Sequence, residues 1–268
     1  SSSAALCVAL SLTLNEEPPA GAQLVYDAQA AENWTGVPCG TMDQAASVFG
    51  QVILYDGPEG TRSVAPSLGD YCFVVVDSRV DRTLGASAYP IRVQEAAEAA
   101  RILQAQWKRP VPNLGSLSQE DLDRIEMSGD DLLSPTLRAR ARHVVTEIQR
   151  VSAGMDAMDA GDWERFGTLM NASGKSSAED YDVSHPRVEA LVATMREVPG
   201  VAGARMMGGG GGGSALALLR VDSLDRLRRQ LTAFFDDESV MDAVVPLSFA
   251  PGARLMSFDE LGVLRPHS

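Results

Sequence analysis

The sequence is poor in the side chains that most often bind transition metals or form cross-links. It contains 3 histidines and 3 cysteines in 268 residues. The cysteines are widely spaced and form no C-x-x-C pair, and the histidines share no spacing typical of metal ligands. We therefore expect no zinc site, no disulfide framework and no Ser-His-Asp triad. Instead we predict buried free thiols at Cys7, Cys39 and Cys72, as is usual in the cytoplasm.

Long hydrophobic runs are also absent. The longest run near the start, Ala4–Leu14, is interrupted by Ser11 and Thr13 and is too short to span a bilayer. The sequence opens with three serines, without a methionine, a basic segment or a small-residue cleavage site. It therefore does not have the pattern of a secretory signal, and we expect it to begin inside a longer gene.

Basic residues are outnumbered by acidic ones. The sequence has 23 Lys and Arg against 36 Asp and Glu, which gives a formal net charge of −13. A field of this sign disfavours nucleic acids and anionic membranes as partners, so an anionic substrate would need local positive groups. Because 45% of the residues are hydrophobic and 22% are charged, the composition is that of a globular protein of one or two domains.

Hydrophobic periodicity predicts helices and strands in alternating groups. The helix at Ala4–Leu14 is apolar on nearly every side, so we expect it to be buried. The last elements follow the order helix, strand, glycine turn, strand, helix, strand, which predicts an α+β fold with helices on an antiparallel sheet. The other expected helices are Ala22–Asn33, one that opens at Tyr89-Pro90, one capped by Ser118 and Asp121, Thr136–Met155, Trp163–Asn171, Pro186–Val198 and Leu224–Phe235. The expected strands are Gln51–Tyr55, Tyr71–Asp77, Val201–Met207, Ser214–Val221 and Ala243–Phe249.

A run of glycines, Gly208–Gly213, matches the G-x-G-x-x-G pattern trivially. A dinucleotide fingerprint would open a helix, and a Walker loop would end in Lys-Ser or Lys-Thr. Here the run leads into Ser214–Leu219, which is predicted to be a strand. Both nucleotide motifs are excluded, and two interpretations stay open: a flexible hairpin tip, or a turn whose backbone approaches another group closely.

Two further segments contain candidate functional residues. Ser1, Ser2 and Ser3 stand directly before the first predicted helix, where hydroxyls and N–H groups either bind an anion or simply cap the helix. Glu32 ends a predicted helix, and Asp43 lies in a connection punctuated by glycine and proline. Two such acids either divide the work of binding Mg²⁺ and orienting a hydroxyl, or are solvated or capping residues.

Taken together, these segments resemble the galactokinase branch of the GHMP small-molecule kinases. The opening serines are similar to the end of the family's second motif, and Gly203–Gly210 is similar to its glycine-rich third motif. The segment around Asp43 is similar to the stretch that holds the catalytic aspartate of galactokinases. The likeness runs in register through Ala31–Asn33, Gly36–Gln44, Asp77–Leu84, Ser87–Arg92, Arg140–Val145 and Asp180–Ser184.

The resemblance implies how ATP and Mg²⁺ would be bound. Ser1, Ser2 and Ser3 would cradle the phosphates of ATP, and Ser3 and Glu32 would help to hold Mg²⁺. Positioning and charge neutralisation of this kind suit phosphoryl transfer, in which the protein has little covalent chemistry to perform.

The resemblance also implies how the sugar would be bound. Asp43 would face the anomeric hydroxyl as a general base or as an electrostatic orienter, and Tyr89 would contact the sugar. Gly208, Gly209 and Gly210 would support the phosphate loop and the substrate. The implied reaction converts galactose and ATP into galactose 1-phosphate and ADP.

Some departures from the family pattern keep the sugar open. Met207 and Gly211 replace a typical Thr and Phe of the third motif, and the family's first motif is not present. Ser173–Ser177 reads Ser-Gly-Lys-Ser-Ser where Ser-His-x-Ser is usual, a form similar to that of galacturonokinases. The alternatives are therefore a galacturonokinase or related sugar kinase, a non-catalytic sensor that binds galactose and ATP and regulates transcription, and an inactive product.

The family resemblance implies three regions. Residues 1–38 would be the remnant of a ribosomal-S5-like N-terminal domain, residues 39–250 a ferredoxin-like C-terminal domain, and residues 251–268 a return segment to the N-terminal domain. Because the first helix would then lack packing partners, we expect the 268 residues alone to be poorly stable and inactive. We also expect a monomer.

Overall fold

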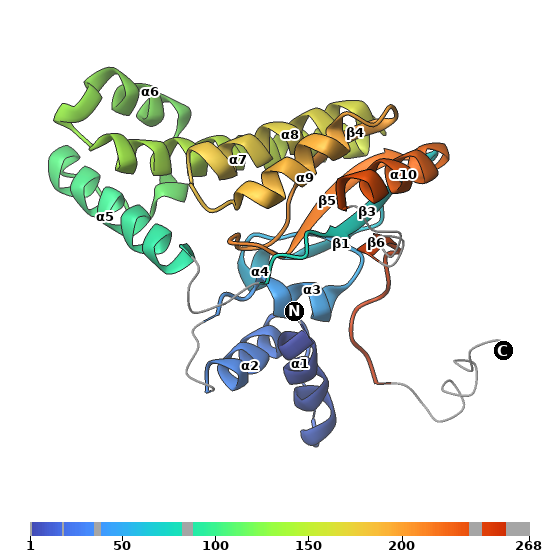
Figure 1. Ribbon diagram of the computed structural model, residues 1–268. Helices are drawn as coiled ribbons and strands as arrows, with labels where there is room; N and C mark the ends of the chain where they lie inside the picture. Colours follow the sequence, from blue (N-terminus) through green and yellow to red (C-terminus); the bar gives the residue numbers. More distant parts are fainter. Residues whose placement is uncertain (1, 18, 35–38, 82–87, 236–242, 256–268) are drawn as a thin grey trace. The chain divides into compact units, whose positions relative to one another are not determined.

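The computed structural model describes residues 2–17, 19–34, 39–81, 88–235 and 243–255 (Figure 1). Contacts divide the chain into two compact units. Unit 1 comprises Ser1–Pro66 and Ser248–Ser268, and unit 2 comprises Ser67–Leu247. The domain boundaries expected from the family resemblance, after residues 38 and 250, stay a prediction. Among the described residues, no helix is both long enough and apolar enough to cross a bilayer.

Unit 1 is built mainly from helices. Its elements are α1 (Ser2–Leu14), α2 (Gly21–Asn33), α3 (Met42–Phe49), α4 (Gly57–Gly60) and the antiparallel strands β1 (Val52–Leu54) and β2 (Arg62–Val64). Its small core consists of Val8, Leu24 and Ala28, with Cys7, Leu12 and Val48 packed against them. The predicted helices at the start of the chain are confirmed, whereas α3, α4 and β2 were not predicted.

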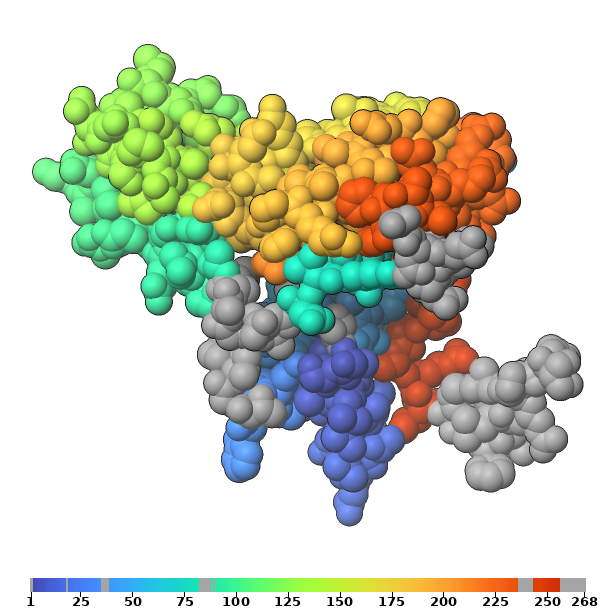
Figure 2. All heavy atoms as spheres, viewed as in Figure 1, coloured from blue at the N-terminus to red at the C-terminus, as the bar shows by residue number. Residues whose placement is uncertain are grey.

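The expectation that the first helix would be buried is wrong for most of its surface. Only Ala4 and Val8 of α1 are buried, and the apolar side chains on the rest of its surface are exposed: Leu6 60%, Leu10 45% and Leu14 77%. An apolar helix buries only the stripe that its neighbours meet, and α2 and α3 are the neighbours of α1. The rest of α1 lies on the surface of its unit (Figure 2).

Unit 2 contains a four-stranded antiparallel sheet. The strands are β3 (Tyr71–Asp77), β4 (Val201–Met206), β5 (Ser214–Arg220) and β6 (Val244–Pro246), in the order β4-β5-β3-β6. Strand β3 pairs with β5 along its whole length, from Tyr71 opposite Arg220 to Asp77 opposite Ser214. The α+β prediction is confirmed, although β6 is shorter than the expected Ala243–Phe249.

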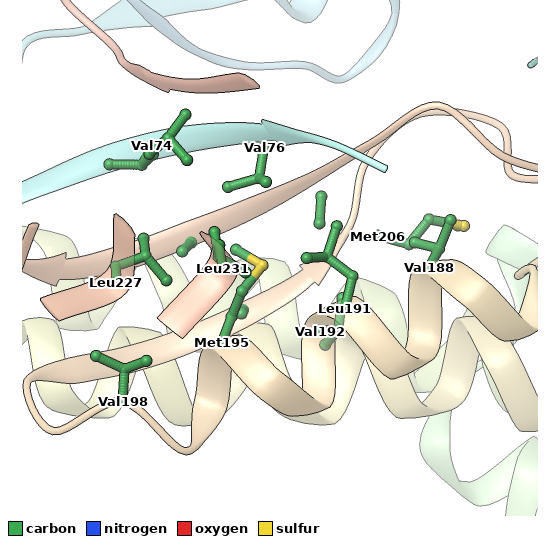
Figure 3. Close-up of a cluster of buried hydrophobic side chains, with 14 of the residues drawn as sticks. Val74, Val76, Val188, Leu191, Val192, Met195, Val198, Met206, Leu227 and Leu231 are labelled. Carbon is green, nitrogen blue, oxygen red and sulfur yellow. The ribbon is translucent and has the colours of Figure 1, made fainter. Parts of the chain in front are cut away.

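Side chains alternate along each strand, so neighbouring residues of β3 meet different helices. Val74 and Val76 of β3 belong to the main core with α9 (Pro186–Arg196) and α10 (Leu224–Phe235), as Figure 3 shows. Phe73 precedes Val74 and lies on the opposite face of β3, where it meets the aromatic rings of α8 (Trp163–Glu179) edge to face. Helices α9 and α10 contact each other on their side of the sheet (Figure 1).

The remaining helices of unit 2 form a second core. They are α5 (Tyr89–Trp107), α6 (Gln119–Ser128) and α7 (Pro135–Asp159), joined by short 3-10 turns at Leu114–Ser116 and Gly129–Asp131. The buried side chains of this core include Leu103, Leu114 and Ile125. The predicted capping box between Ser118 and Asp121 is present. The apolar stripe of α7 is only partly covered, because Ile148 and Val151 are about half exposed.

The three cysteines are free thiols, as predicted. Each of them is half-buried, however, so the expectation of full burial is wrong. Cys7 lies at the rim of the small core of unit 1, and Cys72 is half-buried because its strand position faces the edge of the main core of unit 2.

Candidate functional site

The helix ends of unit 1 bring Ser3 and Glu32 together. Ser3 lies in the first turn of α1, and its hydroxyl donates a hydrogen bond to Oε1 of Glu32, in the last turn of α2. The other carboxylate oxygen, Oε2, accepts a hydrogen bond of 2.6 Å from Nε2 of Gln44, in α3. The carboxylate of Glu32, in α2, therefore accepts hydrogen bonds from side chains of α1 and α3.

The chemistry of Ser3 and Glu32 fits a magnesium ion. Mg²⁺ prefers hard oxygen ligands and takes one or two of them from a protein, the rest from waters and substrate phosphates. A hydroxyl and a carboxylate oxygen within hydrogen-bonding distance satisfy that requirement. Among the described residues there is no cluster of three or more Asp, Glu, His or Cys side chains that would form an all-protein metal site.

The connection predicted around Asp43 is in part a helix. Asp43 lies in the first turn of α3, directly after the N-cap Thr41 and Met42. The helix was missed because it has eight residues and follows a segment rich in glycine and proline. The side chain of Asp43 is exposed, and a carboxylate at a helix N-terminus is favoured by the helix dipole.

Cys39 lies beside the same carboxylate but is not set up as a nucleophile. Its backbone N–H donates to Asn33 Oδ1 at 2.9 Å, and Nε2 of Gln44 lies 3.4 Å from its sulfur. Burial, with the negative charge of Glu32 beside it, raises the pKa of the Cys39 thiol despite the hydrogen bond from Gln44. A raised thiol pKa disfavours the thiolate that nucleophilic or metal-binding chemistry requires.

In unit 2, the glycine run forms the turn between β4 and β5 and is held on both sides. The N–H of Gly211 donates to Val183 O at 2.8 Å, and the N–H of Gly213 donates to Val80 O at 3.0 Å. At Gly210, where φ is +84°, an added Cβ would lie 1.9 Å from Val183 O. The structure therefore favours the close-approach interpretation over a free hairpin tip.

Tyr89, the predicted sugar contact, is the first residue of α5. One turn later, the buried Arg92 donates from Nη2 to Asp182 Oδ2 at 2.9 Å and from Nε to Asp182 O at 3.2 Å. Asp182 has a φ of +53° and directly precedes Val183, which accepts the bond from the glycine turn. One segment thus links the start of α5 to Gly210 and Gly211.

Glu95 completes this link. It accepts hydrogen bonds of 2.6 Å from both Arg92 and Arg140. Burial would raise the pKa of Glu95, but the hydrogen bonds from Arg140 and Arg92 hold it below its ordinary value. Sequence reasoning gave no role to Arg92, Asp182 or Glu95, because a contact between residues 90 positions apart leaves no periodic signal.

Gly174 stands where the family motif usually has a histidine, and arginine side chains occupy the space beside it. A Cβ at Gly174 would lie 2.9 Å from Cβ of Arg205 and 3.0 Å from Nη2 of Arg196. The Arg205 guanidinium, largely buried, donates to Ser173 and Ser177 on the same helix. Helix α8 continues to Glu179, beyond the predicted end at Asn171.

The predicted site residues thus occupy two places, one in each unit. Ser2, Ser3, Glu32 and Asp43 lie at helix ends of unit 1, and Gly208, Gly209 and Gly210 lie in the turn of unit 2. Ser1, residues 35–38 and 82–87, the side chain of Tyr89 and residues 256–268 are outside the described part. Gln44 is the residue that sequence reasoning missed beside Glu32; it was part of the quoted motif, but its contact with Glu32 depends on the fold.

Comparison with known proteins identifies relatives for both units. The family model for the C-terminal part of GHMP kinases matches residues 155–237. A galactokinase from Roseiflexus sp. (strain RS-1) is 40% identical over 252 residues, which are 91% of this chain and 63% of the relative. The Homo sapiens galactokinase is 36% identical over 86% of this chain and 58% of its own length.

Solved structures agree with this comparison. The Lactococcus lactis galactokinase, complexed with galactose, superposes with a TM-score of 0.82 and 32% identity over 94% of this chain and 66% of its own. The L. major mevalonate kinase, in complex with R-mevalonate, is 22% identical over 94% of this chain and 66% of its own, and its TM-score of 0.58 shows a common fold alone. The chain spans about 60% of the length of the curated galactokinases that it matches. It has a galactokinase-like fold, and its residues 155–237 match the C-terminal family of the GHMP kinases.

Proposed function

We propose that the chain forms part of an ATP- and Mg²⁺-dependent kinase that phosphorylates the anomeric hydroxyl of a sugar, galactose first. The observation that carries the proposal is the contact between Ser3 and Glu32. Gln44 of α3 donates to Glu32, and the neighbouring residue in that helix is Asp43, whose carboxylate is exposed. A hydroxyl and a carboxylate suited to Mg²⁺, next to a carboxylate that can orient a hydroxyl, are the parts that phosphoryl transfer requires.

The residues of unit 1 would divide the work. Ser1, Ser2 and Ser3, at the N-terminus of α1, would bind the phosphates through hydroxyls and backbone N–H groups. Ser3 and Glu32 would hold Mg²⁺, which, when bound, neutralises charge on the transferred phosphoryl group. Asp43 would accept or orient the proton of the sugar hydroxyl.

The residues of unit 2 would contribute to sugar binding. Tyr89 would contact the sugar, and Gly208, Gly209 and Gly210 would let the turn approach the substrate closely because they have no side chain. The link through Arg92 and Asp182 would keep the turn and the start of α5 in a fixed relation.

Galactose is the first candidate because the relatives are named galactokinases. Galacturonate is the second candidate, and one observation favours it: Gly174 replaces the histidine of the usual motif and makes room for Arg205. We further propose, from the charge balance and the free thiols, that the protein is a cytoplasmic monomer; sedimentation and cell fractionation test those two points.

The experiment joins the 268 residues to the part of the Roseiflexus galactokinase that precedes the matched region. ADP release is measured with galactose, with galacturonate and with methyl galactoside, whose anomeric hydroxyl is blocked. We expect turnover with galactose, a lower rate with galacturonate and none with the methyl glycoside. The Roseiflexus enzyme is the positive control, and a cooperative thermal transition shows that the joined chain is folded.

The other outcomes decide between the alternatives. Binding of galactose and ATP without ADP release would favour the non-catalytic sensor, and a preference for galacturonate would change the substrate. A folded joined chain that neither binds nor turns over would contradict the proposal. If the joined chain does not fold, residues 29–50 of this chain are placed in the Roseiflexus enzyme instead, where loss of activity in a folded protein is the contradicting result.

A further inference from the structure

Gln44 is the most deeply buried polar side chain near the candidate magnesium ligands. Its relative exposure is 1%, and it directly follows Asp43 in the first turn of α3. Its amide nitrogen donates to Glu32 Oε2 at 2.6 Å. Its amide oxygen, Oε1, is also buried and has no hydrogen-bond partner in the described part of the chain.

The orientation of this amide is set by charge. If the amide were turned over, Oε1 would face a carboxylate oxygen at hydrogen-bonding distance, and the two acceptors would repel each other. Nε2 therefore faces Glu32, and Oε1 stays without a partner. A buried acceptor without a partner lowers stability, so Gln44 is not an optimal choice for stability at this position.

A neutral donor has an advantage for a metal ligand. A lysine or arginine would also hold the Glu32 carboxylate, but its positive charge would neutralise the carboxylate and compete with a cation. A glutamate would place a second carboxylate against the first. The amide of Gln44 fixes one oxygen of Glu32 and leaves the negative charge, and the oxygen on the Ser3 side, available.

The contact with Ser3 cannot hold Glu32 in the same way once a cation binds. Ser3 Oγ and Glu32 Oε1 are the two atoms that would face the ion, so the hydrogen bond between them would give way to bonds with the metal. Glu32 has several rotatable side-chain bonds, and fixing them costs free energy. In that state the hydrogen bond from Gln44 can persist, because it is made to Oε2, the other oxygen of the carboxylate.

We propose that Gln44 is a positioning residue that orients Glu32 for divalent cation binding, and that it is kept at a cost in stability. The inference rests on the proposed function, since it assigns Glu32 to the metal. The hydrogen bond from Gln44 connects Glu32 to the first turn of α3, which also carries Asp43. One helical turn therefore carries Asp43 and positions Glu32. Partners of metal ligands typically change metal affinity by roughly 10- to 100-fold when they are removed.

The test measures Mn²⁺ binding by electron paramagnetic resonance to the 268 residues joined to the N-terminal part of the Roseiflexus galactokinase, with the ATP analogue AMP-PNP present. Gln44→Met has a similar length and lacks both the donor and the unpartnered acceptor. We expect it to weaken Mn²⁺ binding by roughly 10-fold or more while the melting temperature stays equal or rises. The matched control is Gln29→Met, which removes an amide that donates to Cys39 O at 2.8 Å and not to Glu32; we expect its Mn²⁺ affinity to be nearly unchanged.

The outcomes separate this inference from the proposed function. Glu32→Gln should abolish Mn²⁺ binding; if it does not, or if the unsubstituted chain binds no Mn²⁺, the proposed function is contradicted. If Glu32→Gln abolishes binding but Gln44→Met does not weaken it, the role of Gln44 alone is overturned. An equal loss in Gln29→Met, or a large drop in the melting temperature of Gln44→Met, would show a structural role instead.

Discussion

Asp182 combines a backbone requirement with a charge. Its φ of +53° is in the left-handed region, which aspartate tolerates better than most residues because its short polar side chain can hydrogen-bond locally. Its carboxylate pairs with the buried Arg92 at 2.9 Å, although the Asp182 side chain itself is 66% exposed. The residue therefore fixes the segment that carries the acceptor for the glycine turn.

Substitutions of Asp182 should separate the contributions of its backbone conformation and of its ion pair to stability. We expect Asp182→Ala to lower the free energy of unfolding by about 1–2 kcal/mol, because it loses the ion pair and forces alanine into a left-handed conformation. Asp182→Gly should avoid the part of this loss that comes from the backbone conformation, and Asp182→Asn should avoid most of the loss. Denaturant unfolding of the three variants is the measurement, and equal losses in all three would show that the backbone conformation makes no difference.

Sequence reasoning reached the site residues unevenly. Ser3 and Glu32 were paired through the family resemblance, and the structure places them in contact. Asp43 was singled out as a candidate, and its role stays a prediction; the helix that carries it was missed because glycine and proline precede it. Gln44 and Asp182 were not assigned a role, since a long-range hydrogen bond and a positive φ are set by tertiary structure and leave no local pattern.

At the scale of elements, helix α8 approaches strand β4 through glycines. An added Cβ at Gly167 would lie 2.4 Å from the backbone of Ala202, and one at Gly203 would lie 2.2 Å from Gly167 O. The edge of β4 is also closed by side chains: Ala204 N–H donates to Asn171 Oδ1 at 2.9 Å, and Arg196 donates to Ala204 O. This contact layer supports the strand that leads into the glycine turn.

Two glycine substitutions in helices should have opposite effects. We expect Gly167→Ala to destabilise the protein by about 1–3 kcal/mol, because the helix must move away from β4. Gly154→Ala in α7 meets only an ordinary contact of 3.5 Å with Phe166, and alanine favours a helix by about 1 kcal/mol, so its stability should be equal or higher. Thermal unfolding checks both, and a stable Gly167→Ala variant would refute the close packing.

The elements that were predicted best are those with strong local patterns. Tyr71–Asp77 and Leu224–Phe235 were predicted to the residue, because a continuous apolar run and a clear apolar stripe define them. The exposed Ile148 and Val151 on α7 show the limit of this reasoning. Periodicity indicates which face of a helix is apolar, but not whether another element covers that face.

At the scale of the whole molecule, buried titratable groups connect α7 to α8. His143 contacts Ser176 Oγ at 3.0 Å and stacks on Tyr181, and it faces Glu147, Arg150, Asp180 and Arg205. Burial is the main cause that lowers the pKa of His143 below 6.5. Burial would raise the pKa of Glu147, but hydrogen bonds from Ser173 and Arg150 keep it below its ordinary value.

These shifts predict loss of stability in acid. Because the pKa of His143 is lowered in the folded chain, the unfolded chain binds a proton at His143 below pH 6.5 more readily than the folded chain does. The free energy of unfolding therefore falls as pH falls below 6.5. Between roughly pH 6.5 and 5.5 the loss should be at most about 1.4 kcal/mol. Melting temperatures at both pH values should therefore fall less in His143→Gln than in the unsubstituted chain, and an equal fall would exclude His143 as the cause.

The proposed function depends most on Asp43, which we propose serves the transfer of a phosphoryl group to a sugar. The most direct measurement is galactose-dependent ADP release by the joined chain described above, with Asp43→Asn as the variant and a melting curve as the folding control. We expect turnover by the unsubstituted joined chain and a loss of roughly 10²- to 10⁴-fold in Asp43→Asn, with galactose still bound. Undiminished turnover in a folded Asp43→Asn variant would contradict it.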